Sequence, residues 1–218
     1  MEELESIEGM KRKGIVLKLI NSLKQICNHP SQFTKSSNIE VNDSGKMEVL
    51  MNILENILDS NEKVLIFTQY VKMGEIIQKI VEERFDEEVL FLHGSLSRKK
   101  RDQLVTKFQN NTQNKIFVVS LRAGGTGLNL TAASNVIHYD LWWNPAVENQ
   151  ATDRAYRIGQ KDNVMVYRFI TNGTFEERIN EMIRDKRELA ELTVSSGEKF
   201  ITEMDNNELM DLLTLRKS

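Results

Sequence analysis

Short apolar runs alternate with amphipathic stretches along most of the chain, and this alternation limits the possible folds more than any other feature. The predicted strands are 63–70, 88–94, 115–121, 135–140 and 164–170. The predicted helices between them are 71–85, 97–109 and 144–159. Most of the strands are apolar throughout their centres, which is typical of strands that helices cover on both faces. The pattern therefore predicts an α/β fold built on a doubly wound, mainly parallel sheet.

Further helical patterns flank this central region at both ends. We expect helices near 10–26, 46–59, 174–192 and 205–215, with a polar loop at 31–46. The 218 residues suit one large domain with appendages. We divide the chain into an N-terminal helix and linker (1–45), an α/β lobe (46–172) and a C-terminal helix with a tail (173–218).

Composition limits where the protein acts and what it binds. No apolar run approaches the roughly 20 residues that cross a bilayer, and the first residues lack a signal-peptide core, so we expect an intracellular protein without a membrane partner. The single cysteine, Cys27, cannot form an intrachain disulfide and has no second metal-ligand cluster, which favours a structural role. The net charge of −3 means that any polyanion site must be local. The one dense basic run, 98–101, is usual for a solvated helix face.

Ligand sites in doubly wound sheets lie beyond the carboxyl ends of the strands. The residues at those ends are 68–70, 93–95, 120–129 and 140–144. The glycine-rich stretch within 120–130 could let backbone N–H groups approach a phosphate, but it matches neither a Walker motif nor a dinucleotide motif. The short "DSGK" at 43–46 is interpreted as a helix start. Without a triphosphate cradle of its own, such a domain would have to share a nucleotide with a partner domain. His138, within a predicted strand, is interpreted as a buried histidine rather than a catalyst.

The stretch "QATDRAYRIGQ" (150–160) belongs to the helix predicted from Asn144, as N-cap before Pro145, to Gly159. Small and apolar side chains at helical spacing would pack on the sheet. Gln150, Arg154 and Arg157 fall on another face. Two guanidinium groups on one face can straddle a phosphoryl group. Spacing alone leaves open the alternative that both arginines form surface ion pairs.

Several motifs together resemble a known family. They are "LKQICNHP" (23–30), "SGKMEVL" (44–50), "KVLIFTQY" (63–70), "LHGSLS" (92–97), "SLRAGGTGLNLTAASNVIHYDLWWNP" (120–145) and "QATDRAYRIGQ" (150–160). In order and spacing they resemble the second RecA-like lobe of Swi/Snf-family ATPases, which belong to the superfamily-two helicase-like translocases. The resemblance spans about residues 20–190 and is most specific at "WWNP" and "DRAYRIGQ".

The resemblance implies a composite ATP site between two RecA-like lobes of one parent chain. The other, N-terminal lobe would lie outside this chain and hold most of the ATP and its Mg²⁺. Arg154 and Arg157 would be arginine fingers, which are worth about 10³–10⁵ in rate in related systems. The nucleotide would be bordered by Gly125, Gly127, Asn129 and Gln150. The present chain alone would then be an inactive part of an ATPase.

The resemblance also implies translocation along double-stranded DNA. The backbone of the DNA would be contacted through hydroxyl groups and amides of Thr68, Gln69, Gly94, Ser95, Ser120 and Arg122. Trp143 and Asn144 match a position near the groove, although Trp142 and Trp143 could instead be a packed aromatic pair. A DNA-bound protein is a further candidate partner, and a helix at 174–192 resembles a brace that packs toward the other lobe.

Two departures qualify the resemblance. Tyr156 stands where the family more often has histidine, so the role of this position is open. The short spacing between "LHGSLS" and "SLRAGGTG" leaves no room for a large insert, which favours a minimal, prokaryotic-type member in the cytoplasm or nucleoid.

A second hypothesis is a non-catalytic nucleic-acid- or protein-binding α/β module that uses the basic run and the sheet edge. The arginine pair separates the two hypotheses, because only a motor needs both arginines. A small-molecule transferase is disfavoured, since no general base or nucleophile accompanies the glycine-rich stretch.

Overall fold

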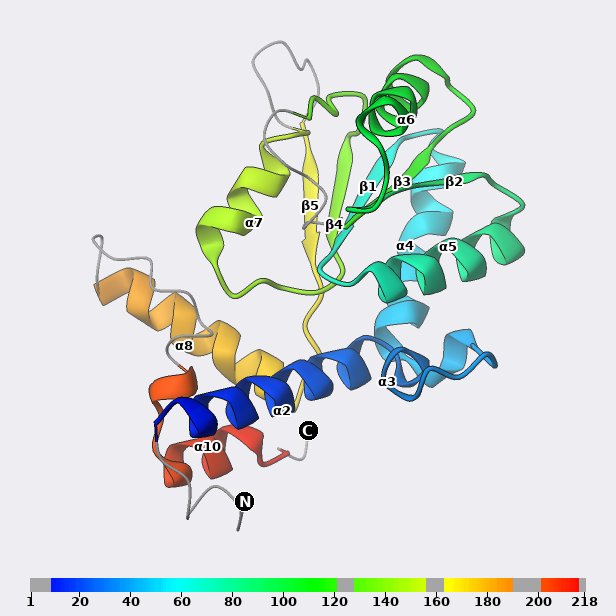
Figure 1. Ribbon diagram of the computed structural model, residues 1–218. Helices are drawn as coiled ribbons and strands as arrows, with labels where there is room; N and C mark the ends of the chain where they lie inside the picture. Colours follow the sequence, from blue (N-terminus) through cyan, green and yellow to red (C-terminus); the bar gives the residue numbers. More distant parts are fainter. Residues whose placement is uncertain (1–8, 121–127, 156–162, 190–200, 216–218) are drawn as a thin grey trace.

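A five-stranded parallel sheet forms the centre of the molecule (Figure 1). The computed structural model describes residues 9–120, 128–155, 163–189 and 201–215. The strands are β1 (Val64–Thr68), β2 (Val89–Leu92), β3 (Ile116–Ser120), β4 (Asn135–His138) and β5 (Met165–Arg168). Their order in the sheet is β2-β3-β1-β4-β5, so β1 lies at the centre. All five predicted strands are present, and the predicted parallel sheet is confirmed.

Two pairs of helices cover the two faces of the sheet. The helices are α4 (Gly45–Asp59), α5 (Val71–Phe85), α6 (Arg98–Asn110) and α7 (Pro145–Thr152). Alternate residues of the strands pack against α4 and α5 on one face, and the intervening residues pack against α6 and α7 on the other. This two-sided burial explains why β1 and β3 have no exposed residue. The edge strand β5 differs, because Met165 is 57% exposed.

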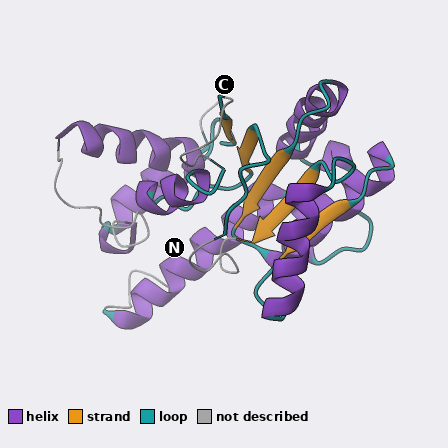
Figure 2. Ribbon diagram, turned by 90° about the horizontal axis from the view of Figure 1, so that it is seen from above, coloured by secondary structure: helices purple, strands orange, loops and turns teal. Residues whose placement is uncertain are grey.

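A third layer lies apart from the covered faces of the sheet. It contains α2 (Met10–Asn28), α8 (Phe175–Leu189) and α10 (Asn206–Leu213), which lie together in both views (Figures 1 and 2). Their apolar side chains form a separate cluster with Leu141 and Trp143 from the loop after β4. The cluster thereby joins α2, α8 and α10 to the carboxyl edge of the sheet.

The structure corrects two predictions about the helices. The predicted polar loop 31–46 contains a short helix α3 (Pro30–Thr34) and a 3₁₀ turn η1 (Val41–Asp43). The residues before α3 favour a helix start, because Pro30 takes the first position and the ring of His29 accepts a hydrogen bond from the amide of Ser31.

Helix α7 begins at the predicted Asn144 cap but ends at Thr152 rather than at Gly159. After Thr152 the backbone tightens, because the amide of Arg154 donates to the carbonyl of Ala151 three residues earlier. The carbonyl of Arg154 then accepts a hydrogen bond from the amide of Leu130. This contact across the fold, rather than a local stop signal, accompanies the end of the helix, and Gly159 lies outside the described residues.

Candidate functional site

Asp140 organises the carboxyl edge of the sheet where β1 and β4 end. Its fully buried carboxylate accepts hydrogen bonds from the hydroxyl of Thr68, the amide of Gln69 at 2.9 Å and the side chain of Asn28 at 3.2 Å. The side-chain amide of Gln69 also donates to the carbonyl of Leu141 at 2.6 Å. The loops that follow the two strands are therefore held together as one unit.

The predicted DNA-contacting residues at this edge differ in exposure. Thr68 and Ser120 are opposite each other in β1 and β3, and both are 0% exposed. The hydroxyl of Thr68 is used within the protein, whereas Gly94 and Ser95 after β2 are exposed. In this conformation Gly94 and Ser95 are accessible to a ligand. Thr68 and Ser120 could contact one only after a conformational change that exposes them.

The two neighbouring tryptophans differ in burial, because Trp143 is buried and Trp142 is half-buried. Trp143 is 3% exposed and has a positive φ of 54°. The ammonium group of Lys24 lies 3.9 Å from its ring centroid, and the ring of Phe175 meets it edge-on at 5.8 Å. Trp143 therefore packs against Lys24 and Phe175 in this structure, while Asn144 caps α7 by accepting from the amide of Ala146 at 3.1 Å.

Two segments that carry predicted nucleotide-side residues meet near the end of α7 at Leu130 and Arg154. The backbone hydrogen bond of 3.0 Å between Leu130 and Arg154 joins the end of the glycine-rich stretch to the arginine motif. Ala151 and Ala155 are buried in the cluster that includes Leu130, and their small side chains allow the close approach. Leu130, at the end of the glycine-rich stretch, and Arg154, in the arginine motif, are therefore neighbours in space.

The side chains around this junction do not share one helix face as predicted. Gln150 is exposed on α7, whereas Arg154 lies beyond the helix and is only 9% exposed. Asn129 is exposed, and its backbone carbonyl accepts from the side chain of Gln109 at 3.1 Å. The other predicted residues, Arg122, Gly125, Gly127 and Arg157, lie outside the described residues, as does Tyr156.

His138 lies under α7 and is a buried strand histidine, as the sequence suggested. Burial, together with the nearby Arg168 guanidinium, lowers the pKa of His138 to about 4. One ring nitrogen lies 3.0 Å from the hydroxyl of Thr152, and the ring stacks on Phe67. Arg168 itself pairs with Glu148 at 2.8 Å. A ring that stays neutral near pH 7 helps α7 to pack on the sheet.

Sequence reasoning missed a buried ion pair beside this edge. Lys46 pairs with Glu176 at 2.8 Å, and both side chains are 4% exposed. The "DSGK" stretch is a helix start as predicted, with Ser44 as the cap of α4. One sequence signal was available, because a lysine in the first turn of a helix opposes the helix dipole and needs a compensating partner.

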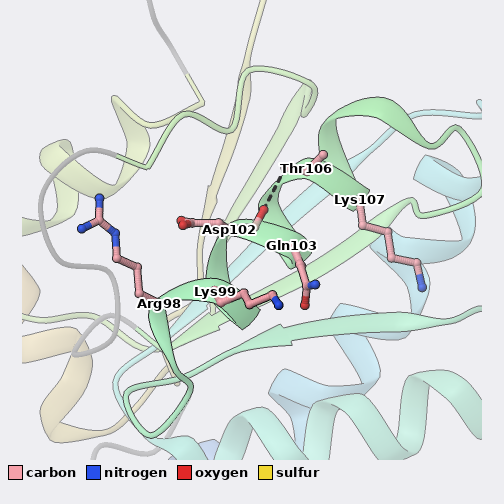
Figure 3. A pocket seen from close by; sticks show the side chains of 6 residues that line it. All are labelled: Arg98, Lys99, Asp102, Gln103, Thr106 and Lys107. Carbon is pink, nitrogen blue, oxygen red and sulfur yellow. Dashed lines mark hydrogen bonds between the residues drawn. The ribbon is translucent and has the colours of Figure 1, made fainter.

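The basic helix α6 presents charged side chains to solvent. Of its residues, only Phe108 is buried. A shallow, open hollow of about 660 Å³ runs along the helix (Figure 3). Its lining residues are Arg98, Lys99, Asp102, Gln103, Thr106 and Lys107. With three cations and one carboxylate, this surface is suited to diffuse attraction of an anion rather than to a closed binding site.

Neither a metal cluster nor a membrane span is found in the part of the chain that the structure describes. Those residues contain no group of three or more histidine, cysteine, aspartate or glutamate side chains that could hold a metal ion. Within the same ranges, every helix is too short or too polar to cross a membrane.

Comparison with known proteins agrees with this geometry. Residues 45–159 match the helicase conserved C-terminal domain. A Bacillus subtilis (strain 168) protein, YwqA, whose name describes an ATP-dependent helicase/translocase, is 49% identical over 98% of this chain and 23% of its own length. The chromatin-remodeling ATPase INO80 of Schizosaccharomyces pombe is 42% identical over 72% of this chain and 10% of its own length. The chain spans about a fifth to a quarter of the curated relatives that it matches over most of its length.

Solved structures show the same fold. The C-terminal domain of the Sulfolobus solfataricus SWI2/SNF2 ATPase is 44% identical, with a TM-score of 0.84 over 99% of this chain and 88% of that one. The core of the same ATPase in complex with double-stranded DNA is 45% identical, with a TM-score of 0.88 over 99% of this chain and 45% of that one. The chain therefore belongs to the helicase conserved C-terminal domain family, within the Swi/Snf-type proteins, and has the fold of the RecA-like C-terminal lobe of SWI2/SNF2 ATPases.

Proposed function

We propose that this lobe forms half of a composite ATP site in a parent protein that moves along double-stranded DNA. Arg154 and Arg157 would act as arginine fingers toward the transferred phosphoryl group. Gly125, Gly127, Asn129 and Gln150 would border the nucleotide. Support comes from the relatives, whose names describe ATP-dependent helicases, and from a structural relative in complex with double-stranded DNA.

The observation that carries the proposal is the hydrogen bond between Leu130 and Arg154. It holds Arg154 against Leu130, the end of the glycine-rich stretch. The guanidinium groups of the arginine motif and the backbone N–H groups of the glycine-rich stretch would then bind the same phosphate ligand. The backbone of Arg154 is held on both sides, because its amide donates to Ala151. A cation held in a fixed place stabilises developing charge without reorganisation during the reaction.

The residues of this lobe suit the phosphates better than the metal. Guanidinium groups match phosphate oxygens, and the described residues offer no carboxylate cluster for Mg²⁺. In the proposed arrangement the N-terminal lobe of the parent chain holds Mg²⁺ and most of the ATP. This lobe alone would then bind nucleotide weakly and hydrolyse it at no appreciable rate.

Exposed residues at the strand ends would meet the DNA backbone. Gly94 and Ser95 present a backbone amide and a hydroxyl without side-chain bulk, which suits sequence-independent phosphate contact. Gln69 and Asn144 are partly exposed at the neighbouring strand ends. Thr68, Ser120, Arg122 and Trp143 remain predictions for this surface.

The decisive experiment measures ATP hydrolysis by the full-length parent, with and without duplex DNA, for Arg157→Ala. We expect a loss of about 10³-fold or more in rate, with nucleotide binding retained, because the charge on the transferred phosphoryl group loses its partner. Arg84→Ala is the matched control, since Arg84 is exposed near the far end of α5. An unchanged rate for Arg157→Ala would favour the binding-module hypothesis instead.

A further inference from the structure

A buried chain of hydrogen bonds connects α8 to the end of β1. The carboxylate of Glu176 accepts from the ammonium of Lys46, which also donates to the Asn28 side-chain oxygen at 3.3 Å. The Asn28 side-chain nitrogen donates to Asp140 at 3.2 Å. The four residues come from α8, α4, α2 and the loop after β4, and each is 6% exposed or less. We call these four residues the buried chain.

The chemistry of its members gives the buried chain one direction. An ammonium group has only donors, and an ionised carboxylate has only acceptors. The amide of Asn28, placed between Lys46 and Asp140, can satisfy both only with its oxygen toward the lysine and its nitrogen toward the carboxylate. Gln32 reinforces this orientation, because its side-chain oxygen also accepts from the Asn28 nitrogen at 3.2 Å. A reversed amide would leave two buried charges facing like-signed dipoles, which is costly.

The buried chain ends on the loop that faces the proposed DNA surface. Asp140 uses one oxygen for the amide of Gln69 and the other for both the hydroxyl of Thr68 and Asn28. The donor from Asn28 therefore helps to fix how the carboxylate is turned. The orientation of the carboxylate then fixes the positions of Thr68 and Gln69.

We propose that Asn28 is a positioning residue for duplex DNA: it orients Asp140, which anchors the buried Thr68 and so holds the partly exposed Gln69 in the conformation that the DNA backbone meets. Lys46 and Glu176 keep the Asn28 amide in the required orientation. This inference rests on the proposed function, since it assigns a role within the DNA surface of that motor.

The first test is Asn28→Leu in the full-length parent. This substitution removes the central amide without stranding a charge, because Lys46 keeps Glu176 and Asp140 keeps Thr68 and Gln69. We expect the DNA concentration for half-maximal stimulation of ATP hydrolysis to rise about tenfold, the order expected for losing a hydrogen bond to a charged group. The maximal rate at saturating DNA should stay within about twofold of wild type, because the nucleotide side is untouched.

Gln32→Leu is the matched control for a merely structural role. Gln32 is also a buried amide and bonds the same Asn28 nitrogen, but it lies outside the path to Asp140. The hydrogen bonds from Ser44 and Tyr139 go to the backbone carbonyl of Asn28, so neither substitution removes them. We expect similar thermal midpoints for both variants, with DNA stimulation weakened much more in Asn28→Leu, because Lys46 and Asp140 still orient the Asn28 amide when Gln32 is replaced.

A swap of the two central groups gives a second, independent test. Asn28→Asp alone sets two carboxylates against each other and should weaken DNA stimulation at least as much as Asn28→Leu. In the double variant Asn28→Asp with Asp140→Asn, the new amide at position 140 can donate to the new carboxylate at position 28, which reverses the wild-type hydrogen bond. We expect this variant to recover most of the lost DNA affinity. The swap also decides the question if Asn28→Leu fails to fold.

The outcomes separate this inference from the proposed function. If wild-type parent protein shows no ATP hydrolysis stimulated by duplex DNA, the proposed function itself is wrong. If wild type is stimulated but Asn28→Leu matches Gln32→Leu, or the swap recovers nothing, Asn28 does not position the DNA surface. Parallel loss of DNA affinity and thermal midpoint in both leucine variants would likewise reduce Asn28 to a structural role.

Discussion

Two regions of this lobe use charged side chains in opposite ways. In the buried chain, each charge has assigned partners and almost no contact with water. On α6, the cations of Arg98, Lys99 and Lys107 line an open hollow (Figure 3). Burial makes charges expensive to leave unpaired, whereas solvent screens charges at a surface. The comparison teaches that the buried chain fixes geometry, while the α6 surface can contribute only diffuse attraction.

The largest effect should come from breaking the buried pair. We expect Lys46→Met to lower the free energy of unfolding by about 3–5 kcal/mol, because Glu176 would be left as an unpaired buried charge. Urea unfolding of the chain at neutral pH would measure the loss. The loss should change little with added salt, since the site excludes solvent.

The control for Lys46→Met removes both charges together. Lys46→Met with Glu176→Leu should recover much of the lost stability, because a well-packed apolar pair often replaces a buried ion pair at little cost. Thr171, whose amide donates to Glu176 at 2.9 Å, would lose its acceptor and limit the recovery. Equal losses in the single and double variants would mean that geometry at this site matters more than charge compensation.

His138, at the end of β4, is a second buried group that can carry a charge, and its effect on stability depends on pH. The pKa of His138 is lowered from its ordinary 6.5 to about 4, chiefly by burial. A pKa below the unfolded value means that the unfolded chain binds the proton first. Stability is therefore complete above pH 6.5 and is lost as the pH falls toward 4, by roughly 3 kcal/mol in total.

His138→Gln isolates this contribution from other titrating groups. The variant should flatten the fall in unfolding free energy between pH 6.5 and about 4, relative to wild type. Urea unfolding at a series of pH values would measure the difference. Parallel pH curves for both proteins would show that carboxylates alone account for acid sensitivity.

Local pattern predicted the sheet well and the polar contacts poorly. The strands could be found because β1 and β3 are buried along their whole length and so are apolar along their whole length. The end of α7 could not be found, since it coincides with a hydrogen bond from Leu130 that no local residue signals. The position of Lys46 in the first turn of α4 indicates that it needs a partner, but Glu176 lies 130 positions away, so no local pattern identifies it as that partner.

The candidate site was predicted in part. Gly94 and Ser95 are exposed at the expected edge, and Gln150 is exposed on α7. Sequence periodicity assigned Arg154 to a helix face with Gln150, but the chain leaves the helix before that residue. The burial of Trp143 depends on α2 and α8, and the hydroxyl of Thr68 is bonded to Asp140 in the loop after β4; in both cases the partners are distant in sequence. Division of the chain at 45 and 172 remains a prediction.

The α6 surface should show its role in salt dependence rather than in stability. We expect Lys99→Gln in the parent protein to lower the slope of log affinity for duplex DNA against log salt by about one, as for one lost phosphate contact. Unfolding free energy should change by less than about 0.5 kcal/mol. Lys79→Gln, at an exposed lysine on α5, is the matched control. An unchanged slope would make α6 an ordinary solvated face and weaken the binding-module hypothesis.

The smallest effect is expected for the exposed pair between Lys107 at the end of α6 and Glu88. Their atoms are 2.6 Å apart, closer than those of the buried pair, yet the side chains are 42% and 56% exposed. Hydrogen bonds from Lys107 and Asn114 lower the pKa of Glu88, so its contribution is present at neutral pH and is lost as the solution is acidified below the ordinary pKa. We expect Lys107→Gln to cost only about 0.2–1 kcal/mol, and to cost less at high salt. If Lys107→Gln lost as much unfolding free energy as Lys46→Met, burial would not be what sets the contribution of ion pairs to the stability of this lobe.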